Sequence, residues 1–488
     1  MSRWTKALKL ETNVARIIHQ QEKNGVEFDL PKANRHIKYL QDTKDAIYKK
    51  VRPYLATEVV NPYTVEVKEP FLKAGGYCQA VSKWYTEEIP DIGGPFSRVG
   101  FVNPDIGSRQ KLQKQLLSHG WIPDLYTEKG SPKLTDKGEP VPSLMRIKAP
   151  IGKDLARWFV LNHRQSQIQG WINRIRPDGR LTAGANSCGT NTARMRHRVV
   201  VNVPKAKESV IFGYEMRDLF ITRDGYRLVG HDAAGLEARM MAHYTSLYDG
   251  GVFAEEILNG DIHTKNAITF FATELQGRIR GDEGFEYYRD LAKTLFYGII
   301  YGAQAPKVAS TIGKPVKEGA KVFNAFWDNS PGLKKLRSRV IALSDKNGWV
   351  PGLDGRKIYT RSSHSALNAV FQSAGAIVMK SSMVILDHLV ERSGLDVVKV
   401  IDMHDESQAE VPDKDIRYTQ GTKEEVMEST KGRIWTPPHL ESDGTYTSMY
   451  TRYGELAVKS IRMAGIALEL RCDLDADYMI GNSWAETH

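Results

Sequence analysis

The segment Arg289-Asp-Leu-Ala-Lys293-Thr-Leu-Phe-Tyr297-Gly-Ile-Ile-Tyr301-Gly302 carries the strongest local signal in the chain. Arg289, Lys293 and Tyr297 are four residues apart, so a helix places them on one face with about 40° of drift per step. This stripe matches a nucleoside triphosphate, because Arg and Lys bind phosphate oxygens and Tyr can abut the nucleoside. An amphipathic helix with solvated cations and a core tyrosine is the alternative, favoured unless acidic sites accompany the helix.

Two aspartates at strand ends supply such acidic sites. Asp232 ends an apolar strand predicted over residues 228–233, and Asp405 lies at the polar turn of a hairpin predicted over residues 397–410. Phosphoryl transfer uses two divalent cations about 3.5–4 Å apart, held by carboxylate oxygens. Two acidic strand ends side by side would form that platform, although an aspartate at one strand end is more often a helix cap or a turn former.

The neighbours of Asp405 favour a site over a simple turn. His404 and Glu406 flank it, so three polar groups interrupt an otherwise apolar hairpin. Asp402 shares a strand face with His404 rather than with Asp405, and we therefore leave it outside the site.

The bulk composition agrees with a protein that binds a polyanion. The chain has 488 residues, a net charge of +10 and ordinary apolar content (41%). This length suggests roughly two to four compact units, and the positive charge favours nucleic acid without proving it. The three cysteines form no CxxC pair, which argues against a disulfide framework or a structural zinc site. Apolar runs such as Val199–Val201 fall far below the roughly 18 residues of a membrane helix.

Periodicity and turn residues predict the remaining elements. Helices are expected over residues 8–51, 108–119, 153–175, 262–343 and 454–468, and a further helix after Asp232 that carries Glu237. Hairpins are expected over 179–203, an inserted polar loop or hairpin over 413–448, and a short strand over 468–474.

Together these segments resemble family A DNA polymerases, the bacterial polymerase I group, and most of all the replicative enzymes of podovirus-type phages. Asp232-Ala-Ala-Gly-Leu-Glu237-Ala-Arg239 is similar to motif A of that family, the segment from Arg289 to motif B, and His404-Asp405-Glu406 to motif C. The likeness covers residues 9–488. It implies an α+β right-hand fold with an antiparallel β-sheet palm, helical fingers and a helical thumb.

The same resemblance implies a domain order and an activity. We expect the thumb and an N-terminal palm-supporting segment in residues 1–180, palm with motif A in 181–260, fingers with motif B in 261–345, and palm with motif C in 346–488. The activity would be template-directed extension of a primer 3′ end with dNTPs, releasing pyrophosphate, in phage-type DNA replication. The thumb-like segment begins near residue 9, so we expect no 3′–5′ exonuclease in this chain.

Site roles follow from the resemblance as well. Two Mg²⁺ ions, for which Mn²⁺ is a possible substitute, would bind Asp232, Asp405 and the backbone carbonyl of Ala233. The expected catalytic residues are Asp232, Asp405, Lys293 and Glu406. The expected nucleotide-binding residues are Arg289, Lys293, His263, Tyr297, Glu237 and Tyr301, of which Glu237 and Tyr297 would exclude a ribose 2′-hydroxyl. The expected DNA contacts are Arg194, Asn368, Gln372 and His404.

Alternatives stay open for some roles and for the function. Asn368 and Gln372 could be satisfied core amides, and His263 a surface histidine. A single-subunit RNA polymerase is the nearest rival, which Glu237 argues against because a ribonucleotide enzyme needs room at the 2′ position. A non-catalytic replication scaffold that binds DNA is the rival from another class. Expected partners are primer–template DNA, dNTPs and a possible separate exonuclease or processivity factor, for a monomer in the host cytoplasm with no membrane.

Overall fold

The computed structural model describes residues 3–60, 68–86, 92–93, 97–98, 100–127, 130–136, 139–147 and 151–487. Two compact units divide the chain: Met1–Leu30 with Trp171–His488 form the larger unit, and Pro31–Gly170 form the smaller one. The predicted boundaries of thumb, palm and fingers stay a prediction.

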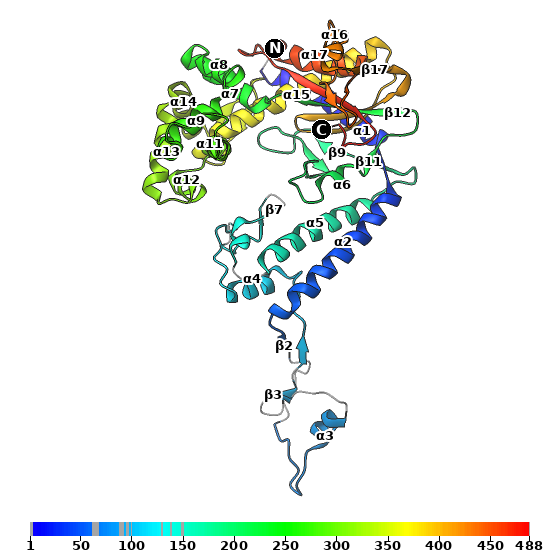
Figure 1. Ribbon diagram of the computed structural model, residues 1–488, viewed down its shortest axis with the longest axis vertical. Coiled ribbons are helices and arrows are strands. Elements are labelled where there is room, and N and C mark those ends of the chain that lie inside the picture. The colour runs from blue at the N-terminus through cyan, green and yellow to red at the C-terminus, as the bar shows by residue number, and fades with distance from the viewer. Residues whose placement is uncertain are drawn as a thin grey trace. The chain divides into compact units, whose positions relative to one another are not determined.

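The smaller unit is built on two long helices, α2 (Leu30–Val51) and α5 (Gly152–Ile172), which lie side by side (Figure 1). The Nζ of Lys44 on α2 donates hydrogen bonds to Asn162 (2.8 Å) and Gln165 (2.5 Å) on α5. The helices predicted over 108–119 and 153–175 are confirmed, since α4 spans Arg109–Ser118. The other elements are short: α3 (Gln79–Thr86), β2 (Glu58–Val60) paired with β5 (Gly100–Val102), β3 (Ile92–Gly93) with β4 (Ser97–Arg98), and β6 (Thr135–Asp136) with β7 (Glu139–Pro140).

A four-stranded antiparallel sheet lies at the centre of the larger unit, in the order β15-β16-β12-β20. The strands are β12 (Tyr226–Ala233), β15 (Val398–Met403), β16 (Glu406–Pro412) and β20 (Ala476–Gly481). Apolar residues such as Val229 on β12 and Ala409 on β16 are fully buried in the core that backs this sheet. The strand predicted over 228–233 and the strand–turn–strand predicted over 397–410 are therefore confirmed.

Helices cover the sheet and extend away from it, as predicted for residues 262–343 and 454–468. Three of these helices carry predicted site residues: α7 (Leu236–Asp249), α9 (Ile262–Phe270) and α11 (Phe285–Ile300). Near the C-terminus, α17 (Arg452–Ala467) packs against the sheet. Further helices of this unit are α1 (Arg3–Asn24), α6 (Gly213–Arg217), α8 (Val252–Leu258), α10 (Ala272–Leu275), α12 (Ala305–Ile312), α13 (Val316–Asp328) and α14 (Pro331–Asn347). Helices and antiparallel strands in one unit confirm the α+β class.

One long helix was not predicted from the sequence. α15 (Ala366–Ser393) is, by length and composition, apolar enough to cross a membrane. Its most apolar 18-residue window is 72% buried inside the protein, and residues such as Ala374 and Ile377 are fully buried. α15 is therefore placed as a core helix, and it runs along α17 and α1.

The sequence also misplaced or missed several strands. The strand predicted over 468–474 is wrong: the chain turns there, and the strand of this region is β20. β1 (Val26–Phe28) was not foreseen, and it pairs with β8 (Arg180–Leu181) and β11 (Phe220–Ile221). The hairpin expected within 179–203 exists as β9 (Gly184–Asn186) and β10 (Arg196–Arg198), and a second small hairpin joins β13 (Trp349–Pro351) to β14 (Lys357–Tyr359).

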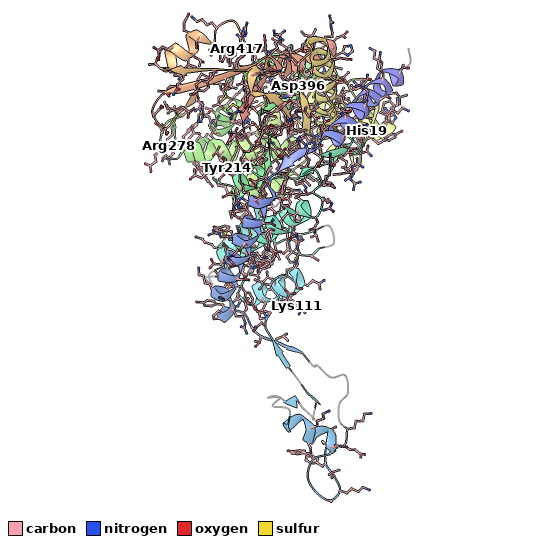
Figure 2. The ribbon with its side chains drawn as sticks, turned by 90° about the vertical axis from the view of Figure 1, so that its right-hand side faces the viewer. His19, Lys111, Tyr214, Arg278, Asp396 and Arg417 are labelled. Atoms are coloured by element: carbon pink, nitrogen blue, oxygen red, sulfur yellow. The ribbon has the colours of Figure 1, made fainter. Side chains whose placement is uncertain are left out.

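The polar insertion is more ordered than the predicted loop or hairpin. It forms a three-stranded sheet of β17 (Ile416–Gly421), β19 (Tyr446–Thr451) and β18 (His439–Leu440), with α16 (Lys423–Ser429) beside it. A capping box between Thr422 and Glu425 starts α16. Arg417 of β17 lies at the periphery of the unit (Figure 2).

Candidate active site

Main-chain pairing brings the two predicted metal-binding aspartates to neighbouring strand ends. In the register of β12 and β16, Asp232 lies opposite Glu406, the residue after Asp405. The backbone N–H of Ala233 donates a hydrogen bond to the carbonyl oxygen of Asp405 (3.1 Å). Residues 232 and 405, which are far apart in sequence, are therefore neighbours at one edge of the central sheet, as the sequence predicted.

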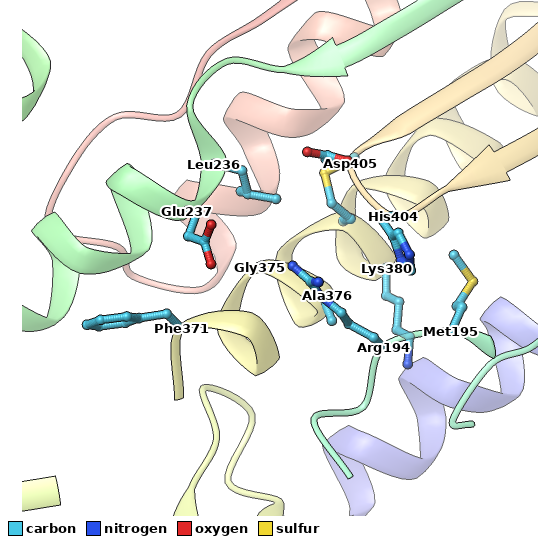
Figure 3. Close-up of a pocket in the computed structure, with 11 residues that line it drawn as sticks. Arg194, Met195, Leu236, Glu237, Phe371, Gly375, Ala376, Lys380, His404 and Asp405 are labelled. Carbon is cyan, nitrogen blue, oxygen red and sulfur yellow. The ribbon is translucent and has the colours of Figure 1, made fainter. Parts of the chain in front are cut away.

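A cavity opens beside this edge (Figure 3). Asp405 and His404 of the turn, Glu237 of α7 and Arg194 face it from different segments. The cavity is further lined by Met195, Leu236, Phe371, Gly375, Ala376, Met379 and Lys380. The cavity thus combines two carboxylates, a guanidinium and an imidazole with an apolar wall from α15, while Asp232 lies next to it and does not line it.

Glu406, predicted as catalytic, points the other way. Its side chain is 6% exposed and accepts hydrogen bonds from Arg217 Nη1 at 3.2 and 3.3 Å. Gln408 Nε2 (2.9 Å) and the indole N–H of Trp484 donate to the same carboxylate. Asp405 lies in the turn between β15 and β16, whereas Glu406 is the first residue of β16. The structure thus gives Glu406 buried contacts with Arg217, Gln408 and Trp484, and its catalytic role stays a prediction.

Arg217 was not singled out from the sequence, yet it holds this edge together. Its guanidinium lies 4.4 Å from the ring centre of Trp484 and donates through Nε to the carbonyl of Pro204 (2.9 Å). Burial lowers the pKa of Arg217, while the charges of Glu406 and Asp232 act to raise it. The side chain is therefore a buried cation close to the acidic strand ends. Its role could not be predicted from the sequence, because its acidic partners are far away along the chain.

The cationic stripe lies on α11, with Arg289 oriented by α9. Asp261 caps α9 through the N–H of Thr264 (3.1 Å) and receives Arg289 Nε and Nη2 at 3.1 and 3.2 Å. The hydrogen bond and charge of Asp261 hold the pKa of Arg289 above its usual value. A two-point contact with a carboxylate fixes the plane of the guanidinium, so Arg289 is presented in one orientation.

His263, Lys293 and Tyr297 gather around that arginine. The rings of His263 and Tyr297 lie 5.9 Å apart between centres. Burial, followed by the charges of Lys293 and Arg289, lowers the pKa of His263. Its Nδ1 is buried and has no hydrogen-bond partner among the described residues. The residues of α9 and α11 that were predicted to bind the nucleotide therefore lie close together, and their role stays a prediction.

The C-terminal end of α11 is tied to α7. The hydroxyl of Tyr301 donates a hydrogen bond to Glu237, and the rings of Tyr297 and Tyr301 lie 6.2 Å apart. Burial, then this hydrogen bond, raises the pKa of Tyr301. Glu237 thus connects the acidic sheet edge with the cationic helix.

The predicted DNA contacts lie on three segments around the cavity. Arg194 and His404 both line it, and the charge of Arg194 acts on His404. Burial, then the charges of His197 and Arg194, lowers the pKa of His404 to about 4. His197 of β10, missed from the sequence, packs edge to face on His404 with ring centres 4.8 Å apart. Asn368 and Gln372 lie one turn apart on α15, and the Oδ1 of Asn368 is buried with no partner among the described residues.

The donor set at the sheet edge fits divalent cations. Two carboxylates and a nearby backbone carbonyl are hard oxygen donors, which Mg²⁺ prefers, and Mg²⁺ sites commonly combine one or two carboxylates with substrate phosphates. Within the described part of the chain, no group of three or more His, Cys, Asp or Glu side chains forms a closed metal cage. Such an open pair suits an ion shared with a phosphate-bearing substrate.

Comparisons with known proteins agree with this geometry. The sequence profile of DNA polymerase family A matches residues 77–439. The DNA-directed DNA polymerase of Escherichia phage T7 is 27% identical over 99% of this chain and 71% of its own length, and that of Enterobacteria phage T3 has the same identity and coverage. In structure, the chain resembles the polymerase domain of Pol1 from M. smegmatis, solved with DNA primer-template and dNTP. The TM-score is 0.70 at 19% identity, over 98% of this chain and 70% of that one.

Acidic strand ends, connected to a cationic helix through Glu237, provide the groups that a nucleotidyltransferase needs, and the family match is more specific. The chain belongs to DNA polymerase family A. It is a DNA-directed DNA polymerase with the α+β polymerase fold, and neither an RNA polymerase nor a non-catalytic scaffold is favoured. Enzymes of this family depend on metal ions.

Proposed function

We propose that this polymerase extends a primer 3′ end on a DNA template with dNTPs, using Asp232, Asp405 and the carbonyl of Ala233 to hold two Mg²⁺ ions. The observation that carries the proposal is the hydrogen bond from the Ala233 N–H to the Asp405 carbonyl (3.1 Å), because it joins the two acidic strand ends. When bound, the metal pair would stabilise the negative charge that develops on the attacking 3′-oxygen and on the leaving pyrophosphate.

The residues of α9 and α11 would hold the triphosphate. Arg289 uses Nε and Nη2 on Asp261, and its Nη1 faces the exposed Glu286 at 3.8 Å, so a phosphate oxygen would compete with Glu286 for Nη1. Lys293, one turn further along the same face and exposed, adds a point charge. His263 keeps a depressed pKa, so near neutral pH it would offer a neutral N–H donor to a phosphate oxygen.

Glu237, Tyr297 and Tyr301 would set the space available to the sugar. The hydroxyl of Tyr301 already bonds to Glu237, and Tyr297 lies against Tyr301. A ribose 2′-hydroxyl entering this space would need both room and a polar partner, so a deoxyribose is favoured.

Arg194, Asn368, Gln372 and His404 would contact the primer–template next to the reacting end. Arg194 and His404, which can donate hydrogen bonds, line one cavity with Asp405, whereas the buried atom of Asn368 without a partner among the described residues is Oδ1, an acceptor. Minor-groove acceptors lie at similar positions in every correct base pair, so such donors can test pair geometry without reading sequence.

Primer extension with Asp405→Asn tests the metal assignment. The substitution preserves size and removes one anionic ligand, so we expect Mg²⁺-dependent extension to fall about 10²-fold or more. Asp328→Asn is the matched control, because Asp328 is exposed on α13 and pairs only with Lys334 (2.7 Å) in the described contacts. Unchanged extension by Asp405→Asn would remove Asp405 from the metal site, and equal incorporation of dNTPs and rNTPs would contradict the sugar-pocket assignment.

A further inference from the structure

A buried lysine, Lys380 of α15, lies in the wall of the active-site cavity (Figure 3). Its side chain is 1% exposed. Burial lowers its pKa, and the hydrogen bond and charge of Glu11 oppose that shift. A buried ammonium is costly unless it is paired, so its partners indicate what the fold gains from keeping it.

Lys380 has two partners from distant parts of the chain. Its Nζ donates to Glu11 Oε1 on α1 (2.7 Å) and to the backbone carbonyl of Ala193 (2.7 Å). Arg356 Nη1 donates to the same Glu11 oxygen (2.6 Å), and Arg356 also pairs with Asp354 (2.6 Å). Glu11 therefore keeps a buried cationic partner without Lys380. Of the two contacts that Lys380 makes, only the one to the Ala193 carbonyl has no second cation to replace it.

Ala193 is an unusual residue to hold. Its φ is 60°, in the left-handed region that is unfavourable for a residue with a Cβ. The next residue, Arg194, lines the cavity, and its carbonyl accepts from Thr190 Oγ1 (3.1 Å). Met195 then packs into a core cluster with Ile17 of α1 and Met383 of α15. The backbone is thus pinned on both sides of Arg194.

We propose that Lys380 is a positioning residue for Arg194: by holding the Ala193 carbonyl it fixes the direction from which the guanidinium enters the cavity, and so sharpens discrimination between matched and mismatched primer ends. This inference rests on the proposed contact of Arg194 with the primer–template. Lys380 itself stays bound to Glu11 and Ala193 and does not touch the substrate.

Lys380→Met is the main test, because methionine keeps most of the length of the side chain and removes the donor. Misplacing a substrate-positioning group by about 1 Å can cost on the order of 10²-fold, so we expect kcat/KM on a matched primer end to fall roughly 10- to 100-fold. The ratio of matched to mismatched extension should fall with it. In an Arg194→Ala background, Lys380→Met should change either quantity less than about 2-fold, since the group it positions is gone.

Two further variants separate positioning from a loss of stability. Lys44→Met removes another buried lysine, one that bonds to Asn162 (2.8 Å) in the smaller unit, and it should leave discrimination unchanged. Ala193→Gly keeps the carbonyl that Lys380 holds, and glycine adopts a φ of 60° without strain, so it should leave discrimination unchanged. If Lys380→Met does not fold, Lys380→Gln, which removes the ammonium and has a shorter side chain, decides the question, because it should lower discrimination in the same way.

The possible outcomes separate the role of Arg194 from the role of Lys380. If Arg194→Ala leaves extension and discrimination unchanged, the proposed function of Arg194 fails. If Arg194→Ala lowers them while Lys380→Met and Lys380→Gln do not, or if the losses from Arg194→Ala and Lys380→Met simply multiply, the positioning role is wrong and the assignment of Arg194 stands.

Discussion

The buried pair of Arg217 and Glu406 offers a sharp test of what the residue after Asp405 does. Glu406→Gln removes one charge at nearly constant volume and leaves the guanidinium buried, with the Pro204 carbonyl (2.9 Å) and the Trp484 ring as remaining partners. The two side chains are 5% and 6% exposed, with Nη1 at 3.2 and 3.3 Å from the carboxylate oxygens. Breaking such a pair costs about 3–5 kcal/mol, because one charge stays buried without its partner.

The double variant Arg217→Met/Glu406→Gln should recover much of that loss. The amide oxygen of the new glutamine can still accept from Trp484, and no buried charge is left without a partner. We therefore expect the double variant to be at least about 2 kcal/mol more stable than the sum of the single losses. Urea unfolding followed by tryptophan fluorescence is a suitable assay, because Trp484 is fully buried against this pair.

Two results would refute this reasoning. Additive losses would mean that the two groups do not stabilise one another. A Glu406→Gln protein with wild-type stability but without primer extension would place Glu406 in the reaction, as the sequence first suggested, and outside a structural pair.

Three other predictions concern single side chains. Lys293→Ala should lower primer extension by about 10²-fold or more, as expected for a lost preorganised charge; a loss confined to DNA affinity would place Lys293 on the duplex. Tyr297→Phe should reduce acceptance of dideoxynucleotides in competition assays, and an unchanged ratio would remove Tyr297 from the sugar pocket. His243 accepts a hydrogen bond at Nδ1 from the Arg471 N–H (3.1 Å), and burial, then the Arg471 charge, lowers its pKa to about 4. Between pH 6.5 and 4 only the unfolded chain gains this proton, so the free energy of unfolding should fall with pH by up to about 1.4 kcal/mol per unit. His243→Asn keeps an acceptor and does not titrate, so its urea-unfolding profile should be flatter by that amount; equal slopes would exclude His243 as the cause.

Local patterns in the sequence predicted the elements that carry the reaction. The apolar run that ends at Asp232 and the four-residue spacing from Arg289 to Tyr297 are properties of one strand and one helix, so they can be recognised without knowing the fold. The convergence of Asp232 and Asp405 needed the ordered motifs as well, because no single motif fixes which strands pair.

What the sequence did not predict depends on partners distant along the chain. Arg217 and Glu406 are 189 residues apart, and Lys380 and Glu11 are 369 apart. A periodic pattern carries no information about such pairs. The strand β1 has only three residues, and its identity depends on pairing with β8 and β11, which is a tertiary effect.

The small inserted sheet has a consequence for how this enzyme can vary. Ile416, at its entry, lies opposite Thr451, at its exit, so the chain leaves and rejoins the rest of the unit at nearly one point. A segment whose ends meet can lengthen or shorten at little entropic expense. The distance in space between the end of β16 and the start of α17 then does not depend on the length of the inserted segment. We therefore expect that a reporter or a tether can be inserted into this segment without loss of DNA synthesis.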